Sequence, residues 1–202
     1  MNLERSEDGP LTDTELITAT LSGDHKAFQM LLERYESRVA ATVFGMVGHS
    51  DVAEDIGQET FIRFYKSLSD FQGKSSIGTY LTRIAVNLSL NELKRRKRRS
   101  IYSFFQSDEP GEEYPGNSLP DPRATAEYDD TADLVHRALQ QLDPKFRSVV
   151  VLRLLEGCST RETAEILQLP TGTVLSRLAR AQEKLKDILT PYMGEYYEPI
   201  NS

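Results

Sequence analysis

The stretch STRETAEILQLPTGTVLSRLARAQEKLKD, residues 159–187, has the pattern of two short helices joined by a tight turn. Ser159 and Glu162 have the spacing of a capping box, in which each side chain bonds the backbone N–H of the other residue. Pro170 interrupts the first helix, and Thr171 is a candidate N-cap for the second. Apolar residues recur every three or four positions of the second helix and predict one buried face. They are Val174, Leu178, Ala181, Leu185 and Ile188. The stretch therefore predicts a helix-turn-helix.

A second stripe on the same helix carries hydroxyl groups and cations, namely Thr173, Ser176, Arg177, Arg180 and Lys184. Such a stripe is long enough to lie in a DNA major groove and to contact phosphates and base edges. A helical hairpin with a merely solvated basic face has the same local pattern. The rest of the chain has to decide between these two interpretations.

The charges of the chain are segregated, and their distribution matters more than the net charge of −7. Residues 83–99 hold seven cations and one acid, including the run KRRKRR at 94–99, whereas residues 108–133 hold nine acids and one base. Salt screens fields beyond about 10 Å. The basic segment can therefore meet a polyanion although the whole chain is acidic.

Composition excludes several classes of protein. The 202 residues allow one or two domains, and the absence of a run of about 18 apolar residues predicts no membrane insertion. The polar, acidic N-terminus is unlike a signal peptide, and Cys158 is the single cysteine, so we expect a cytoplasmic protein without an internal disulfide. The histidines lie far apart without ligand spacing, and we expect no metal ion or other cofactor.

Helical periodicity and turn signals predict an all-α fold of two small helical domains joined by a flexible acidic linker. The first domain is expected at residues 12–99, the proline-rich acidic linker at 100–128 and the second domain at 129–190. Residues 1–11 and 191–202 are expected to be disordered tails. Within the first domain, helices are expected at 25–46, 51–68 and 79–99.

The predicted helix after Asp51 has an acidic face opposite its apolar stripe. This face carries Asp55, Gln58, Glu59 and Ile62 at positions i, i+3, i+4 and i+7. Carboxylate and amide groups around one apolar side chain suit a basic helical partner, although such faces often serve only as solvated surface. Acid–base catalysis is a weaker interpretation, because no histidine or nucleophile accompanies the carboxylates.

The segment from residue 71 to residue 99 combines a polar loop with a helix that ends in cations. The loop holds Phe71, Gln72, Gly73, Lys74, Ser75 and Ser76, and the helix adds Tyr80, Arg83, Asn87, Lys94, Arg95 and Arg98. Rings, amides and cations together suit unpaired bases. We expect the Tyr80 ring to pack in the core. The basic run predicts contact with phosphates, with a solvated helix end as the alternative.

These residues resemble a known family. Residues 51–61 with 71–99 look like region 2 of the bacterial RNA polymerase sigma factors, and residues 142–181 look like region 4. Two regions with only a short acidic linker resemble the extracytoplasmic-function group. The resemblance extends over about residues 12–190, and two independent motif sets are more specific than either alone.

The resemblance implies a role for each surface. The acidic face, from Asp55 to Ile62, would bind the β′ clamp helices of core polymerase. Loop 71–76, with Asn87, would capture a flipped base of the −10 element while Arg83 and residues 94–99 hold phosphates. The polar stripe of the helix-turn-helix would read the −35 element, and region 4 would also contact the β flap. The family also implies an anti-sigma factor that masks the core-binding surfaces.

The sequence departs from the family pattern at several positions. Tyr80 stands where tryptophan is common, and Gly57 replaces a better helix former, at a cost of about 1 kcal/mol relative to alanine. Gln168 stands where a glycine often makes the turn of the helix-turn-helix. Leu175 and Ala179 are apolar at positions where relatives often contact DNA.

The expected function is a dissociable initiation subunit that binds core polymerase, directs it to a two-element promoter and helps to open the −10 region. It is not expected to be an enzyme. A helix-turn-helix regulator that recruits polymerase would use residues 159–187 but leave the first hundred residues without a role. A sigma mimic that acts as a protein-interaction decoy would keep the fold and need no DNA.

Overall fold

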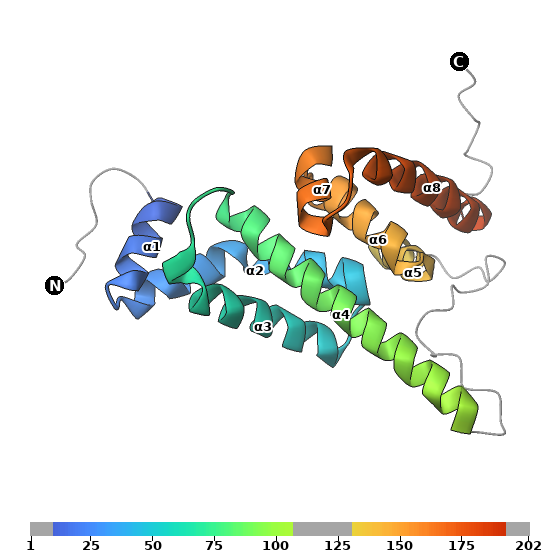
Figure 1. Ribbon diagram of the computed structural model, residues 1–202, viewed down its shortest axis with the longest axis horizontal. Coiled ribbons are helices and arrows are strands. Elements are labelled where there is room, and N and C mark those ends of the chain that lie inside the picture. The colour runs from blue at the N-terminus through green and yellow to red at the C-terminus, as the bar shows by residue number, and fades with distance from the viewer. Residues whose placement is uncertain (1–9, 107–130, 193–202) are drawn as a thin grey trace, which may run out of the picture.

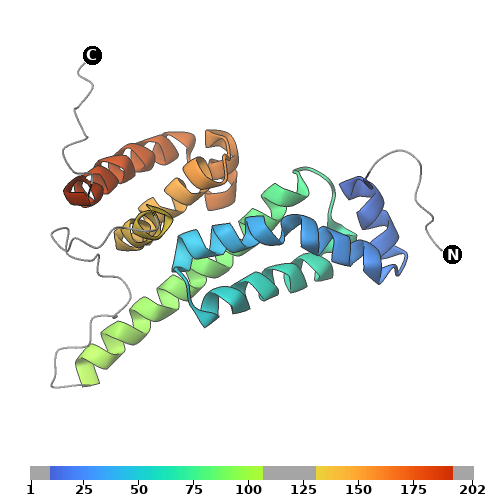
Figure 2. The same cartoon turned by 180° about the vertical axis from the view of Figure 1, so that it is seen from behind.

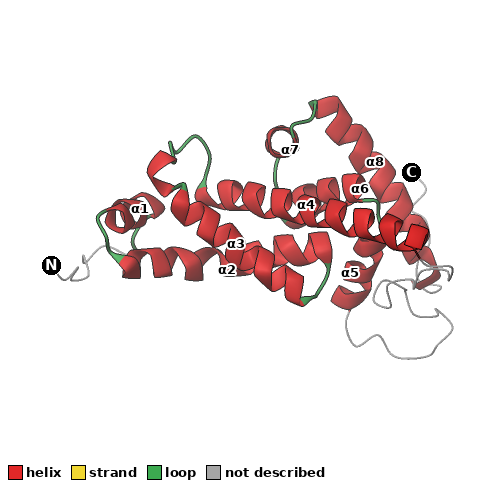
Figure 3. Cartoon of the chain, turned by 60° about the horizontal axis from the view of Figure 1, so that its bottom comes forward, coloured by secondary structure: helices red, strands yellow, loops and turns green. Residues whose placement is uncertain are grey.

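The computed structural model describes residues 10–106 and 131–192, which we call the first and the second lobe. Every regular element in these two ranges is a helix, as Figures 1 and 3 show, which confirms the all-α prediction. The first lobe holds α1 (Asp13–Leu21), α2 (His25–Val47), α3 (Asp51–Lys66), a short 3₁₀ turn (Leu68–Asp70) and α4 (Ile77–Gln106). The second lobe holds α5 (Thr131–Gln141), α6 (Pro144–Val150), a π-helical turn (Val151–Leu155), α7 (Thr160–Leu167), α8 (Thr171–Leu189) and a final 3₁₀ turn (Thr190–Tyr192). No helix in the described residues is long and apolar enough to cross a membrane.

The first lobe is built around α2, which packs against α1, α3 and α4. Asp24 caps α2 by accepting a hydrogen bond from the backbone N–H of Lys26 at 2.9 Å. The core between these helices is apolar and fully buried, with Leu31, Val43, Met46, Phe64 and Leu81 at its centre. The apolar stripe predicted for α3 lies in this core, since Ala53, Ile56, Thr60, Phe64 and Leu68 are all buried. That stripe orients α3 and leaves its acidic face outside.

The helix boundaries differ from the predicted ones at several points. Asp51 is the expected N-cap of α3, but Ser50 takes that position and Asp51 is the first helical residue. Leu68 lies in the 3₁₀ turn that follows α3. Helix α4 begins two residues earlier than expected, at Ile77, and continues past residue 99 to Gln106. The expected linker lies outside the described residues except for 100–106, which are helical.

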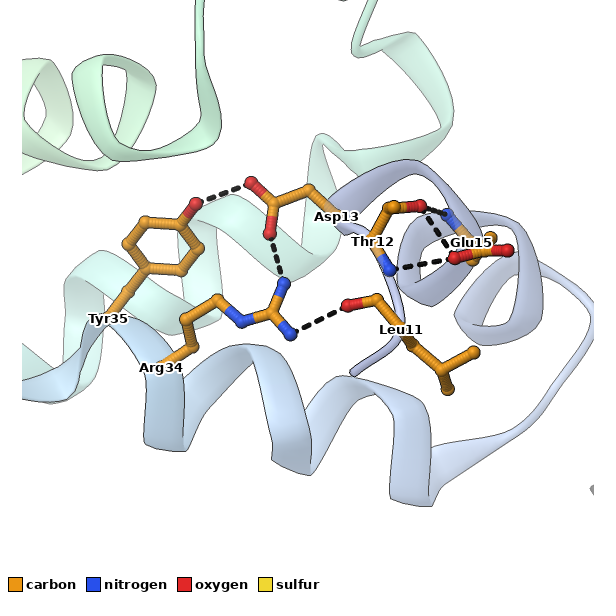
Figure 4. A network of polar contacts seen from close by, with 6 residues as sticks. All are labelled: Leu11, Thr12, Asp13, Glu15, Arg34 and Tyr35. Atoms are coloured by element: carbon orange, nitrogen blue, oxygen red, sulfur yellow. Dashed lines mark hydrogen bonds and ion pairs between the residues drawn. The ribbon is translucent and has the colours of Figure 1, made fainter. Parts of the chain in front are cut away.

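The residues before α1 are held against α2, as Figure 4 shows. Arg34 forms an ion pair with Asp13 at 2.6 Å and donates to the carbonyl of Leu11 at 2.7 Å. The Tyr35 hydroxyl donates to the second Asp13 oxygen, and burial together with this bond raises the pKa of Tyr35 to about 12. Leu11, which the sequence placed in a disordered tail, therefore belongs to the first lobe, while residues 1–9 and 193–202 lie outside the described ranges.

The predicted helix-turn-helix is α7 and α8. The capping box is confirmed: Ser159 N–H donates to the Glu162 carboxylate at 2.8 Å, and Glu162 N–H donates to the Ser159 hydroxyl at 3.2 Å. The first of these bonds also lowers the pKa of Glu162. Gln168 makes the turn with a left-handed backbone, at φ 55° and ψ 48°, where a non-glycine residue costs about 1–2 kcal/mol. The expected N-cap at Thr171 is wrong, because Pro170 takes that position and Thr171 is the first helical residue.

The two lobes are in contact. Residues of both contribute to one buried apolar cluster, in which Val151, Leu152 and Cys158 join the core of the first lobe. The Glu156 side chain, only 4% exposed, accepts from Arg38 at 2.9 Å and from the Thr42 hydroxyl at 2.7 Å. A buried carboxylate needs such partners, because its desolvation is otherwise uncompensated.

A buried arginine lies at the same contact. The Arg147 guanidinium donates to the carbonyl of Met46 at 2.5 Å and to the Gln140 side-chain oxygen at 2.6 Å. It also donates to the carbonyls of Gln140 and Leu142. Burial, with the nearby Arg96, lowers its pKa to about 10, so that Arg147 stays charged at neutral pH. One side chain thus ties the end of α2 to the turn between α5 and α6.

Helix α2 packs closely against the second lobe at Gly45. A Cβ at this position would lie 3.0 Å from the Val151 Cγ2 atom and 3.3 Å from the Leu155 Cδ1 atom. Any larger residue therefore meets the second lobe, and glycine allows the backbones to come together.

We expect Arg147→Met to lower the free energy of unfolding by roughly 2–4 kcal/mol, because it removes the donors that four buried or partly buried oxygens share. Urea unfolding followed by circular dichroism measures this loss. The control is Arg137→Met. The Arg137 guanidinium pairs with Asp133 on the surface at 2.8 Å, so this variant should lower the free energy of unfolding by less than about 1 kcal/mol. Equal losses in the two variants would contradict the role given to Arg147.

We expect Gly45→Leu to separate the lobes and to expose the thiol of Cys158, which is 3% exposed and whose pKa is raised by burial. Overpacking of this size costs about 1–3 kcal/mol, so labelling of the single cysteine by a disulfide reagent should be roughly tenfold faster. The control Gly57→Leu adds the same side chain where a Cβ meets nothing within 4 Å, so it should leave the labelling rate unchanged. Unchanged labelling of a folded Gly45→Leu protein would rule out the interlobe contact in solution.

Candidate polymerase and nucleic-acid interfaces

The predicted docking residues share the outer face of α3, which lies along one edge of the first lobe (Figure 1). Asp55 and Gln58 are exposed, and the apolar Ile62 is 47% exposed. Glu59 is half-buried and pairs with Arg63 one turn further on, at 2.7 Å. The four residues therefore form one surface, and Ile62 is its apolar member.

An apolar groove between α2 and α3 adjoins this face, with a volume of about 900 Å³. Gln58 and Ile62 line it from the docking face, and Tyr65, 45% exposed, lies one turn beyond. The apolar walls come from both helices, with Phe28, Leu32, Val39, Phe44 and Phe61 among them, and acidic groups of Glu36 and Glu54 lie at the lining. Sequence analysis missed this groove. Its signal was the excess of apolar residues in α2 over those needed for a single buried face.

The loop predicted to bind a flipped base is exposed from Gln72 to Ser76. Phe71, by contrast, is half-buried and packs with its ring centre 5.2 Å from that of Tyr80 and 6.4 Å from that of Phe64. The Tyr80 hydroxyl donates to the Ser67 hydroxyl at 3.1 Å, which confirms the packing role expected for its ring. Phe71 and Tyr80 thus anchor the base of the loop, and its exposed polar groups lie beyond them.

One face of α4 carries the remaining residues predicted for the −10 surface. Arg83, Asn87, Lys94 and Arg98 are exposed and lie at i, i+4, i+11 and i+15, which places them along one side of the helix. The Arg83 guanidinium lies 5.8 Å from the centre of the Tyr80 ring. This face continues from the loop along the helix and forms one extended cationic surface.

Glu92 modifies this surface, and the sequence analysis gave it no role. Its carboxylate is 9% exposed and accepts from Arg95 at 2.6 Å and from Arg96 at 3.0 Å. Although burial opposes the shift, these two partners lower the pKa of Glu92. Arg95 is therefore already paired, whereas Lys94 and Arg98 keep exposed charges.

Helix α8 lies on the outer side of the second lobe, away from α2, in both Figure 1 and Figure 2. Its buried residues Val174 and Ala181 belong to the small cores that hold it to the rest of the lobe. Of the predicted −35 residues, Ser176, Arg180 and Lys184 are exposed and Thr173 and Arg177 are half-buried. The predicted stripe is thus accessible along its length.

Together, these features define a two-lobed helical protein with a helix-turn-helix, a second cationic surface and an acidic face beside an apolar groove. The chain matches the family model of sigma-70 region 2 over residues 31–99 and that of sigma-70 region 4 over residues 132–185. It is 33% identical over 191 residues to the RNA polymerase sigma-H factor of Pseudomonas aeruginosa, which covers 91% of this chain and 96% of that relative.

A second relative is the ECF RNA polymerase sigma-E factor of Escherichia coli strain K12, 36% identical over 184 residues, which are 90% of this chain and 96% of the relative. The solved structure of the sigma factor RpoE from Bartonella quintana has the same fold, with a TM-score of 0.63 and 23% identity over 82% of this chain and 98% of that one. The chain belongs to the extracytoplasmic-function group of the sigma-70 family of transcription initiation factors.

Proposed function

We propose that this sigma factor binds core polymerase through α3 and the α2–α3 groove, reads a −35 element with α8 and holds an opened −10 element with loop 71–76 and α4. The observation that carries this proposal is the separation of charge in one chain. An acidic face with an apolar groove lies on one edge of the first lobe, and cationic surfaces lie on α4 and α8. Nucleotide polymerisation itself belongs to the polymerase, and the factor acts with it in the cytoplasm.

Core docking follows from the chemistry of the α3 face. Asp55 and Glu59 favour a basic partner such as a clamp helix, and charge complementarity of this kind raises association rates and selects the partner. Ile62 and Tyr65 provide apolar surface at the groove, and buried apolar anchors contribute most of the binding energy at interfaces. A helix laid along the groove would satisfy both requirements at once.

The −10 role follows from the loop and α4. A base extruded from the stack costs a few kcal/mol, which contacts in a polar pocket have to offset. The loop offers Gln72, Lys74 and Ser75 above the ring anchor formed by Phe71 and Tyr80. The cations along α4 would hold the neighbouring phosphates in place.

The −35 role follows from the exposed stripe of α8. Each bidentate contact of an arginine with guanine contributes about 1–3 kcal/mol of discrimination. Arg180 is the exposed arginine of the stripe, with Ser176 one turn before it and Lys184 one turn after it. The region 4 lobe would also meet the β flap of polymerase.

We further propose an anti-sigma factor as regulator. The Bartonella quintana sigma factor was crystallised in complex with the anti-sigma factor NepR. In the present chain, the α2–α3 groove would accept such a partner, which would then mask the surface that core polymerase requires. A plain DNA-binding regulator and a sigma decoy both leave part of these surfaces without a role, the groove in the first case and the cations in the second.

We expect Glu59→Arg to weaken binding to sigma-free core polymerase by at least tenfold, because reversing a close interfacial charge costs several kcal/mol. The variant also removes the pairing of Glu59 with Arg63. A fluorescence competition assay measures the affinity. The matched control is Glu33→Arg, an exposed acid on α2 away from the groove lining, which should bind normally. Unchanged affinity of a folded Glu59→Arg protein would exclude the α3 face.

We expect the purified protein to initiate specific transcription with sigma-free core polymerase, and Arg180→Ala to reduce the yield by roughly tenfold. Core binding of the variant should remain normal, because Arg180 lies outside the α3 docking face and its stripe on α8 is assigned to DNA. Run-off transcription on matched templates with intact and scrambled −35 elements provides the readout. Loss of −35 dependence in the variant supports the assignment, and equal transcription from the two templates by the unmodified protein refutes it.

A further inference from the structure

The exposed face of α8 carries an apolar strip that the polar residues do not account for. Leu175 is 54% exposed, Ala179 is exposed one turn further on, and Gly172 lies one turn before. The strip borders Ser176, while the side chains that hold α8 to its lobe, such as Val174, lie on the other side of the helix. Leu175 thus points outward on α8, beside the exposed polar and cationic residues of the same helix.

A single exposed apolar residue is ordinary on a protein surface, but the place of Leu175 is not an ordinary one. The first turns of a recognition helix are those that reach base edges in the major groove. Residues 171–182 contain no acidic side chain, so this half of α8 can approach DNA without repulsion. Gly172 has no neighbour within 4 Å at its Cβ position and presents bare backbone there.

The chemistry of the DNA major groove limits which base Leu175 can contact favourably. A leucine side chain can neither donate nor accept a hydrogen bond, and the major groove has one apolar feature, the 5-methyl group of thymine. Opposite a purine N7 acceptor or a cytosine amino donor, the same side chain would displace water and leave a polar group unpaired, which lowers affinity. Leucine therefore favours thymine for two reasons: it makes an apolar contact with the methyl group, and it lowers affinity for bases that present a polar group at that place.

We propose that Leu175, supported by Ala179, is a specificity-determining residue that contacts the methyl group of a thymine in the −35 element. The inference rests on the proposed function of α8 as the −35-reading helix. The −35 element would then require a thymine at one position, which the hydroxyl and cationic stripe of α8 does not specify. The partner is a pyrimidine methyl group in duplex DNA, and the contact involves no hydrogen bond.

The test uses holoenzyme assembled from core polymerase and the full chain. Selection from a randomised −35 library first identifies the preferred bases, and each thymine is then replaced singly by 2′-deoxyuridine, which removes only the methyl group. We expect a loss of about fourfold in affinity at one or two positions, as for burial of one methyl-sized group. Leu175→Ala should bind the thymine and deoxyuridine duplexes equally.

The control variant is Leu21→Ala, which removes an equally exposed leucine, also 54%, from α1 in the first lobe. It should keep the full difference between thymine and deoxyuridine. A selected element without thymine, or a difference that survives in Leu175→Ala, would overturn the inference. So would a defect of Leu175→Ala in core binding, since the residue would then contact protein.

Failure of this inference and failure of the proposed function give different results. If scrambling the −35 element has no effect on the unmodified holoenzyme, α8 does not read that element and the proposed function itself is wrong. If scrambling lowers affinity but no thymine can be told from deoxyuridine, the helix reads the element and only the role of Leu175 is wrong.

Discussion

The buried guanidinium of Arg147 is the interaction on which most of this structure depends. Its donors are shared among the carbonyls of Met46, Gln140 and Leu142 and the Gln140 amide oxygen, which belong to α2, α5 and the turn after α5. A planar fork of five donors suits such divergent acceptors, and a lysine could not replace it. Because a buried cation without partners is very costly, this side chain helps to fix α5, α6 and the end of α2 relative to one another.

Charge also decides what each surface is able to bind. The chain is acidic overall, yet its buried carboxylates, Glu92 and Glu156, are neutralised by arginines within the protein. Glu92 forms ion pairs with Arg95 and Arg96. The cations Arg83, Lys94 and Arg98 are exposed along one side of α4. The acids of α3 stay nearer the surface, although Glu59 pairs with Arg63 there. Opposite charges thus lie on different edges of the same protein.

The sequence predicted local structure better than it predicted contacts between distant segments. Capping at Ser159, the unusual turn at Gln168 and the buried stripe of α3 follow from neighbouring residues, and all are present. The interlobe contact joins Thr42 to Glu156, more than a hundred residues apart, and periodicity gives helical faces without saying which faces meet. The groove and the role of Glu92 were missed for the same reason. Each depends on a second helix or on a pairing choice that spacing alone leaves open.

The close packing at Gly45 has a thermodynamic consequence for every partner of this protein. Both halves of the contact belong to one polypeptide, so their association is unimolecular and does not weaken on dilution as a dimer would. A ligand that requires the halves to be apart binds only the fraction of molecules already separated. Its apparent dissociation constant is therefore raised in inverse proportion to that fraction. The packing of the Val151 methyl groups against Gly45 thereby contributes to the apparent affinity of such a ligand.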